Sequence, residues 1–197
     1  MQVQGLRWAS SGDLVPSPGQ DAIDPALVLY FGSRDGIASG GIFAQLKSRF
    51  PDAQIIGCST GGQIHDDDNL DDEIAAVAIT FESTQVRVAS RSVETVDETR
   101  ASARAIAEEL NAPDLAGIFI LSDGLNVNGS ELVAGITDIV GKDIPLTGGL
   151  AGDGAQFEQT LLGVNDTPRS HLVVGIGFYG ACVRFGHGSA GGWDVFG

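Results

Sequence analysis

Two short, uninterrupted apolar runs constrain the fold of this 197-residue chain most strongly. One run covers residues 26–31 and the other covers residues 115–121, and each is followed directly by glycine and polar residues. An apolar run of this length without polar alternation is typical of a strand that is buried on both faces. Such strands need a covering layer on each face of their sheet, so the runs indicate an α/β architecture.

Helical segments separate the predicted strands. Apolar residues at helical spacing predict a first helix that ends before Pro51, which cannot continue it. A second helix is predicted over residues 95–110, where Thr95 begins a capping box, and a third helix follows the cap residue Asn128 and ends at Gly141. Further strands are predicted over residues 53–56, 74–81, 86–90, 144–146, 157–164, 172–179 and 183–187.

The order of these elements repeats along the chain. Residues 27–62 predict strand, helix, strand and glycine loop, and residues 117–154 predict the same order about 90 residues later. Chance similarity between two α/β halves is the alternative. The repeat predicts a layered sandwich of mixed β-sheets with flanking helices, in which β-α-β-β-β halves over about 26–92 and 115–189 are related by pseudo-two-fold symmetry. Both glycine loops are then expected beyond the carboxyl ends of strands, near each other.

The composition argues against several classes of partner. The chain carries 26 acidic and 11 basic residues, for a net charge of −15, and such a surface repels nucleic-acid phosphates and anionic lipid. The two cysteines, Cys58 and Cys182, form no CxxC pair and fit a reducing compartment. No pattern of a signal peptide and no apolar run long enough to span a bilayer is present, so we expect a cytoplasmic location.

The glycine loop over residues 57–62 is the first candidate binding segment. Cys58, Ser59, Thr60 and Gly61 offer a thiol, two hydroxyl groups and backbone amides within a few positions. Glycines permit the positive φ angles of an anion-binding nest, so this loop is a candidate site for a small carboxylate or phosphate. The Gly-Lys-Ser/Thr ending of a P-loop is missing. A tight strand exit, with glycines needed only for packing, is the alternative.

Polar residues directly follow the apolar run 115–121. Ser122, Asp123 and Asn126 are therefore placed to project into a cleft at the end of a buried strand. The Asp123 carboxylate could accept hydrogen bonds from an ammonium group, and Asn126 could both donate and accept. An Asx turn at the entry to the next helix explains the same residues equally well.

A second glycine-rich segment covers residues 147–154. Its candidate residues are Gly148, Gly149, Gly152 and Asp153, which combine backbone amides with a carboxylate. Together with the first loop, this segment supplies donors for an anion and acceptors for a cation. A zwitterion such as an amino acid requires this pairing, although other polar crevices also supply both.

Metal and enzyme sites find weaker support in the sequence. The acidic stretch that begins with residues 65–68 could suggest a calcium-binding loop, but the glycine required at the sixth position of such a loop is missing. A solvated acidic loop is therefore favoured over a metal site. We expect no metal and no cofactor. A nucleophile at Cys58 or Ser122 paired with a histidine stays open, but no nucleophile-elbow pattern is present, and we expect no catalytic residues.

Several segments, taken together, resemble the FIST N-terminal domain family of intracellular signal-transduction sensors. The similarity covers residues 26 to 193. The segments that carry it are Ile56-Gly-Cys-Ser-Thr-Gly-Gly-Gln-Ile64, Leu121-Ser-Asp-Gly-Leu-Asn126, Thr147-Gly-Gly-Leu-Ala-Gly-Asp-Gly154, and Gly186-His-Gly-Ser189 followed by Gly192-Trp193.

The resemblance implies a domain that senses a small ligand, with an amino acid as the expected class. It also implies a FIST C-terminal domain and a downstream signalling domain as partners. We accordingly expect an arm over residues 1–25, the sensory domain over 26–190 and the start of a linker over 191–197. The three polar segments would then contact the ligand.

Two other functions stay open. An enzyme of the hydrolase or transferase type would use Cys58 or the glycine loops, and it requires a thiol with a lowered pKa or a phosphate cradle. A scaffold for protein partners would instead present an exposed apolar patch.

Overall fold

The computed structural model describes residues 1–8, 12–65, 68–70 and 73–186. Its strands form two mixed sheets and a small two-stranded sheet. The predicted linker start at 191–197 and the end of the predicted strand 183–187 lie outside these residues. In the described part of the chain, no helix has the length and apolar character needed to cross a membrane.

The first sheet has six strands in the order β11-β4-β3-β7-β1-β2. The strands β3 and β4 are parallel, and β7 runs antiparallel to β3 on its other side. The bounds are β1 Gln2–Trp8, β2 Leu14–Pro16, β3 Leu27–Gly32, β4 Gln54–Ser59, β7 Ile74–Thr80 and β11 Leu162–Val164. The small sheet pairs β5 (Gln63–His65) with β6 (Asp68–Leu70).

The second sheet has four strands in the order β10-β9-β12-β8. Here β9 and β10 are parallel, and β12 runs antiparallel to β9. The bounds are β8 Gln85–Ser92, β9 Leu115–Ser122, β10 Leu146–Leu150 and β12 Leu172–Tyr179. The two sheets therefore share one arrangement, β4-β3-β7 in the first and β10-β9-β12 in the second, while the pseudo-two-fold symmetry stays a prediction.

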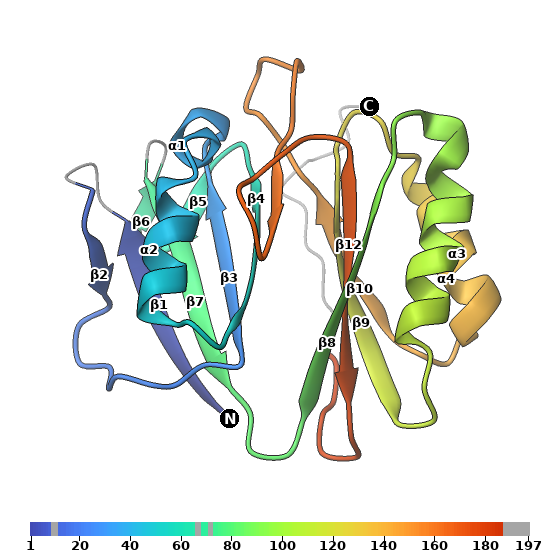
Figure 1. Ribbon diagram of the computed structural model, residues 1–197, viewed down its shortest axis with the longest axis horizontal. Helices are drawn as coiled ribbons and strands as arrows, with labels where there is room; N and C mark the ends of the chain where they lie inside the picture. Colours follow the sequence, from blue (N-terminus) through green and yellow to red (C-terminus); the bar gives the residue numbers. More distant parts are fainter. Residues whose placement is uncertain (9–11, 66–67, 71–72, 187–197) are drawn as a thin grey trace, which may run out of the picture.

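The helices cover the outer faces of the sheets, so the domain has four layers (Figure 1). The short helix α1 (Arg34–Ala38) and α2 (Gly41–Arg49) lie on the first sheet, and α3 (Thr99–Leu110), which follows a 3-10 turn (Val96–Glu98), lies with α4 (Gly129–Val140) on the second. This arrangement confirms the predicted layered α/β sandwich.

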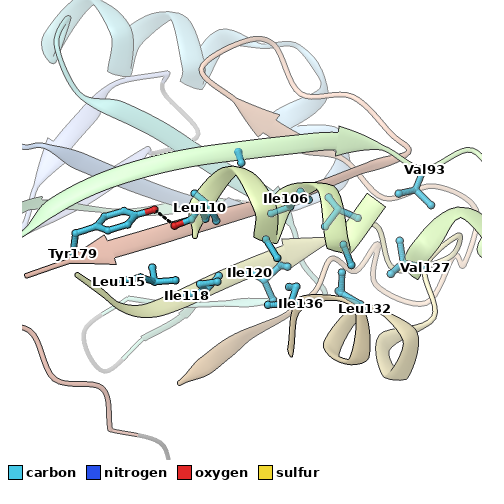
Figure 2. Packing of buried hydrophobic residues seen from close by; sticks show 14 residues of the cluster. Val93, Ile106, Leu110, Leu115, Ile118, Ile120, Val127, Leu132, Ile136 and Tyr179 are labelled. Atoms are coloured by element: carbon cyan, nitrogen blue, oxygen red, sulfur yellow. Dashed lines mark hydrogen bonds between the residues drawn. The ribbon is translucent and has the colours of Figure 1, made fainter. Parts of the chain in front are cut away.

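Three apolar clusters fill the three interfaces between these layers. Val28 and Tyr30 of β3 pack toward α2, whereas the alternate residue Leu27 packs between the two sheets with Ile56 and Val174. Both faces of β3 are thus buried, as the apolar run predicts. The third cluster joins α3 and α4 to the second sheet; Figure 2 shows its side chains.

The helix ends follow the predicted signals. The Asn128 side chain accepts hydrogen bonds from the amides of Ser130 and Glu131, which otherwise have no partner in the first turn of α4. Gly141 caps the other end of α4 with φ 84°. The helix α2 ends at Arg49, before Pro51.

Several segments differ from the sequence-based prediction, and the first is the N-terminal arm. Its first residues form β1, which pairs with β7 along all seven positions. Leu6 is fully buried in this strand. The sequence does not show the alternation of apolar and polar residues that marks a strand, because Gln4 and Gly5 interrupt it.

The strand β8, which the prediction assigns to the first half, pairs with β12 in the second sheet.

The other differences concern residues 144–186. The strand predicted at 144–146 lies at Leu146–Leu150, where Gly148 passes so close to β9 that a Cβ atom would lie 1.8 Å from the Ile120 carbonyl oxygen. The strand predicted at 157–164 begins only at Leu162, because the amides of residues 157–159 bind the Asp153 carboxylate instead of a neighbouring strand. Residues 183–186 form no strand, and Phe185 packs edge-to-face on Phe178.

Two buried tyrosines provide a matched test of this packing. The Tyr30 hydroxyl group is buried and has no hydrogen-bond partner among the described residues, whereas Tyr179 donates to the Leu110 carbonyl oxygen at 2.6 Å (Figure 2). A buried polar group without a partner costs about 1–3 kcal/mol. We therefore expect Tyr30→Phe to raise the free energy of unfolding by about 1 kcal/mol and Tyr179→Phe to lower it by about 1 kcal/mol.

Urea unfolding of both variants measures this difference. Equal losses of stability in the two variants would contradict the assignment of Tyr30 as unpartnered.

Candidate functional site

The three polar segments meet at one edge of the sandwich. Strands β4 and β9 end at Ser59 and Ser122, and the chain that leaves β10 crosses both ends. The amide of Ala151 donates to the Ser122 carbonyl oxygen at 2.8 Å, and the amide of Gly152 donates to the Ser59 carbonyl oxygen at 2.9 Å. Backbone hydrogen bonds therefore join all three segments, although Ser59 and Gly152 are 93 residues apart in the sequence.

Asp123 is buried at the centre of this junction. Its Oδ1 atom accepts hydrogen bonds from the amides of Leu125 and Asn126 and from the Asn126 side chain. Its Oδ2 atom accepts from the Thr160 hydroxyl group and the His171 amide. Burial alone would raise the pKa of Asp123, but these hydrogen bonds outweigh it and hold the pKa below its ordinary value.

Asp153 binds the segment that follows it in the chain. Its carboxylate accepts hydrogen bonds from the amides of Gln159, Glu158 and Phe157, at 2.7 to 3.1 Å, and these bonds lower the pKa of Asp153. Phe157 has φ 54°, a left-handed conformation that is uncommon for a residue with a side chain. The carboxylate therefore holds the chain in a turn that its local preferences do not favour.

The buried hydroxyl group of Ser59 completes the set. Its Oγ atom accepts a hydrogen bond from the Leu161 amide at 2.9 Å. The three residues Ser59, Asp123 and Asp153 thus all bind the segment 157–161, which we call the bridging segment. The structure brings them together, and their oxygen atoms are occupied by groups of the chain itself.

Two polar hollows flank the bridging segment. The Asp123 hollow has a volume of about 310 Å³ and is lined by Arg34, Asp123, Leu125, Asn126, Glu158, Gln159, Thr160, Ser170 and His171. The Gly61 hollow has a volume of about 380 Å³ and is lined by Ser33, Arg34, Asp35, Thr60, Gly61, Asp153, Gly154, Ala155 and Gln156. Arg34 lines both, so the hollows adjoin at this residue.

The predicted site residues divide into three groups. Thr60, Gly61, Asp123, Asn126 and Asp153 line the two polar hollows. Cys58, Ser59 and Ser122 are buried at the strand ends, and Gly152 packs against the backbone of Gly61. Gly148 and Gly149 belong to β10 and line a different hollow of about 260 Å³, together with apolar side chains such as Leu132.

The lining residues Arg34, Glu158 and His171 are not among the residues predicted from the sequence. Arg34 lies two residues after the end of β3, whose carboxyl end lies at the same edge as that of the parallel strand β4. Residues after β4 and β9 were selected because ligands bind beyond the carboxyl ends of strands, and the same reasoning applies to Arg34. No comparable signal marks Glu158, which lies in a segment predicted as a strand, or His171, which directly precedes the predicted strand 172–179.

Cys58 does not have the environment of a nucleophile. Its side chain is 2% exposed, and burial raises the pKa of the thiol to about 12. The thiolate is the reactive form, so at neutral pH this thiol is protonated and unreactive. Among the residues that the structure describes, no three His, Cys, Asp or Glu side chains gather as a metal site.

Alkylation provides a test within one molecule. Cys182 is exposed and Cys58 is buried. We expect iodoacetamide to modify Cys182 in the folded chain and to leave Cys58 intact until urea unfolds it, as measured by peptide mass spectrometry. Rapid modification of Cys58 in the folded state would contradict the raised pKa and would favour the enzyme alternative.

The lowered pKa of Asp123 predicts a dependence of stability on pH. A carboxyl group with a lowered pKa in the folded state stabilises the fold above its unfolded pKa, and this contribution is lost as the pH falls through the folded pKa. We expect Asp123→Asn to reduce the free energy of unfolding by about 1–3 kcal/mol at pH 7, because an amide cannot accept all five hydrogen bonds.

This loss should shrink as the pH falls below about 3.9, because the Asp carboxyl group of the unfolded chain then takes up a proton before the folded one does. Urea unfolding at pH 7 and pH 3 measures it, with the exposed Asp52→Asn as the control. A loss that is the same at both pH values would contradict the ionised state of Asp123.

Comparison with known proteins assigns the chain to a family. A search of curated proteins finds no match. The family model of the FIST N domain matches residues 26–197, which include all three polar segments and the bridging segment. The match covers most of the chain, and the FIST domain is a sensor domain of signal transduction. This chain therefore belongs to the FIST N domain family.

Proposed function

We propose that this domain binds a small ligand, an amino acid, against Arg34 where the two polar hollows meet. The observation that carries the proposal is the convergence of the three polar segments on hollows that hold a cation beside carboxylates. An amino acid carries one group of each sign, and the hollow volumes fall within the roughly 300–1,000 Å³ of small-molecule sites. Family membership supports the sensory role.

The predicted site residues take two roles in this proposal. Thr60, Gly61 and Asn126 line the hollows, and in this proposal they contact the ligand. Ser59 and the two aspartates, with their oxygen atoms already occupied, keep the bridging segment in position. The ligand would then bind against the bridging segment, whose conformation these hydrogen bonds fix.

The proposed setting is a cytoplasmic signalling protein, in which a FIST C-terminal domain and a downstream signalling domain respond to the ligand. Two free cysteines support a reducing compartment. A response requires that the ligand has different affinities for two states of the protein.

A thermal-shift screen of the twenty amino acids tests this function. A ligand at 100 times its dissociation constant stabilises the folded state by about 2.7 kcal/mol, which raises the unfolding midpoint by roughly 5–10 °C for a domain of this size. Sodium chloride at equal concentration controls for ionic strength. A flat response to the amino acids and to common small acids would contradict the proposal.

Two glycine substitutions then locate the ligand. A Cβ atom at Gly61 would make only ordinary contacts, and one at Gly149 would meet nothing within 4 Å, so both positions tolerate a side chain. We expect Gly61→Leu to fill the Gly61 hollow and abolish the shift, and Gly149→Leu, in the β10 hollow, to leave it unchanged. The reverse pattern would place the ligand beside β10.

A further inference from the structure

Arg34 provides the positive charge of the candidate site. Among the described residues, it is the only lysine or arginine that lines either polar hollow. The carboxylates of Asp35, Asp123, Asp153 and Glu158 line the same hollows, and the whole chain has a net charge of −15. An anionic group of a ligand therefore finds one favourable partner here, the Arg34 guanidinium.

The present partners of Arg34 are held loosely. Its Nη1 atom lies 3.2 Å from Glu158 Oε2, and its Nε atom lies 3.2 Å from Asp35 Oδ1. The Glu158 and Asp35 side chains are 71% and 80% exposed, whereas that of Arg34 is only 19% exposed. Ion pairs with exposed carboxylates contribute little, so a ligand can replace one of them at small cost.

The buried carboxylates of Asp123 and Asp153 are already engaged by the chain itself. Asp123 already accepts five hydrogen bonds and Asp153 three, all from the chain itself. Glu158 differs, because its backbone amide is held by Asp153 at 2.7 Å while its side chain extends into solvent. Its carboxylate can thus leave Arg34 without any change in the bridging backbone.

We propose that Arg34 binds the carboxylate of the ligand and that Glu158 occupies this position when the ligand is absent. A ligand carboxylate that replaces Glu158 can also accept from Nη2, which has no acceptor among the described residues, and so form a two-point contact. The released Glu158 carboxylate then becomes an acceptor for the ligand ammonium group. This inference rests on the proposed function and names the residues that select its ligand.

The surroundings favour a carboxylate over a phosphate. A carboxylate brings one negative charge, the same as the Glu158 group that it replaces. Inorganic phosphate brings up to two charges near neutral pH, and it would face Asp35 and Asp153 at close range. We therefore expect acetate, and not phosphate, to bind at Arg34.

NMR titration of the full chain tests the exchange, with the Nε–Hε signal of Arg34 as the probe. The titrants are sodium acetate, glycine and inorganic phosphate at constant ionic strength. We expect acetate and glycine to shift the Arg34 signal to saturation. In Arg34→Gln, the backbone amides of Gly154 and Gln159 should report at least tenfold weaker binding of acetate, because a charge-assisted hydrogen bond is lost.

Glu158→Gln gives a signature that a merely structural role would not produce. Removal of the internal competitor should tighten acetate binding about two- to fivefold, the range that an exposed ion pair sets. The same change should weaken glycine relative to acetate, because the acceptor for the ammonium group is lost. The exposed pair Arg91–Glu109 provides matched controls, since Arg91→Gln and Glu109→Gln change the net charge equally and should leave both affinities unchanged.

The outcomes separate the two proposals. Acetate binding that is unchanged in Arg34→Gln or weakened in Glu158→Gln would overturn the inference, as would phosphate binding tighter than acetate. An amino acid that stabilises wild type and Arg34→Gln equally would preserve the sensory function and overturn the role of Arg34. Acetate binding at Arg34 with no stabilising amino acid would preserve the carboxylate site and contradict the amino-acid function.

Discussion

The hydrogen-bonding demand of two carboxylates with little exposure determines the form of the candidate site. A carboxylate removed from water is stable only if donors surround it, and Asp123 and Asp153 obtain most of theirs from backbone amides. To supply the three amides that bind Asp153, the bridging segment gives up strand pairing and accepts a left-handed residue at Phe157. The energetic cost of this backbone conformation is offset because each carboxylate stays charged and hydrogen-bonded.

This arrangement also links the two sheets near the site. The bridging segment leads directly into β11, which pairs with β4 in the first sheet, while Thr160 binds Asp123 at the end of β9 in the second. A ligand that displaces Glu158 therefore acts on a segment with hydrogen bonds to both sheets.

Much of the fold could be predicted because its main signals are local. The apolar run at Leu27–Gly32, the cap at Asn128 and the proline after α2 each act within a few residues, and each has the predicted consequence. The strand β1 could not be predicted in this way, because its place beside β7 depends on pairing partners about 70 residues away rather than on its own alternation.

The candidate site was predictable in location but not in chemistry. The residues after β4 and β9 do meet, since the carboxyl ends of strands gather at one edge. Backbone amides elsewhere in the chain determine which of these residues keeps a free hydrogen-bonding group. The spacing of apolar residues in the sequence carries no information about those hydrogen bonds. Hence Asp123 was selected for its carboxylate, although its oxygens already accept five hydrogen bonds, while Arg34 was not selected.

A crystal structure of the chain with the most stabilising amino acid bound would test the account most directly. The account predicts the ligand carboxylate within hydrogen-bond distance of the Arg34 guanidinium, with Glu158 turned away and the hydrogen bonds of Asp123 and Asp153 intact. A ligand bound in the β10 hollow, or bound at the polar hollows with Arg34 still paired to Glu158, would contradict it.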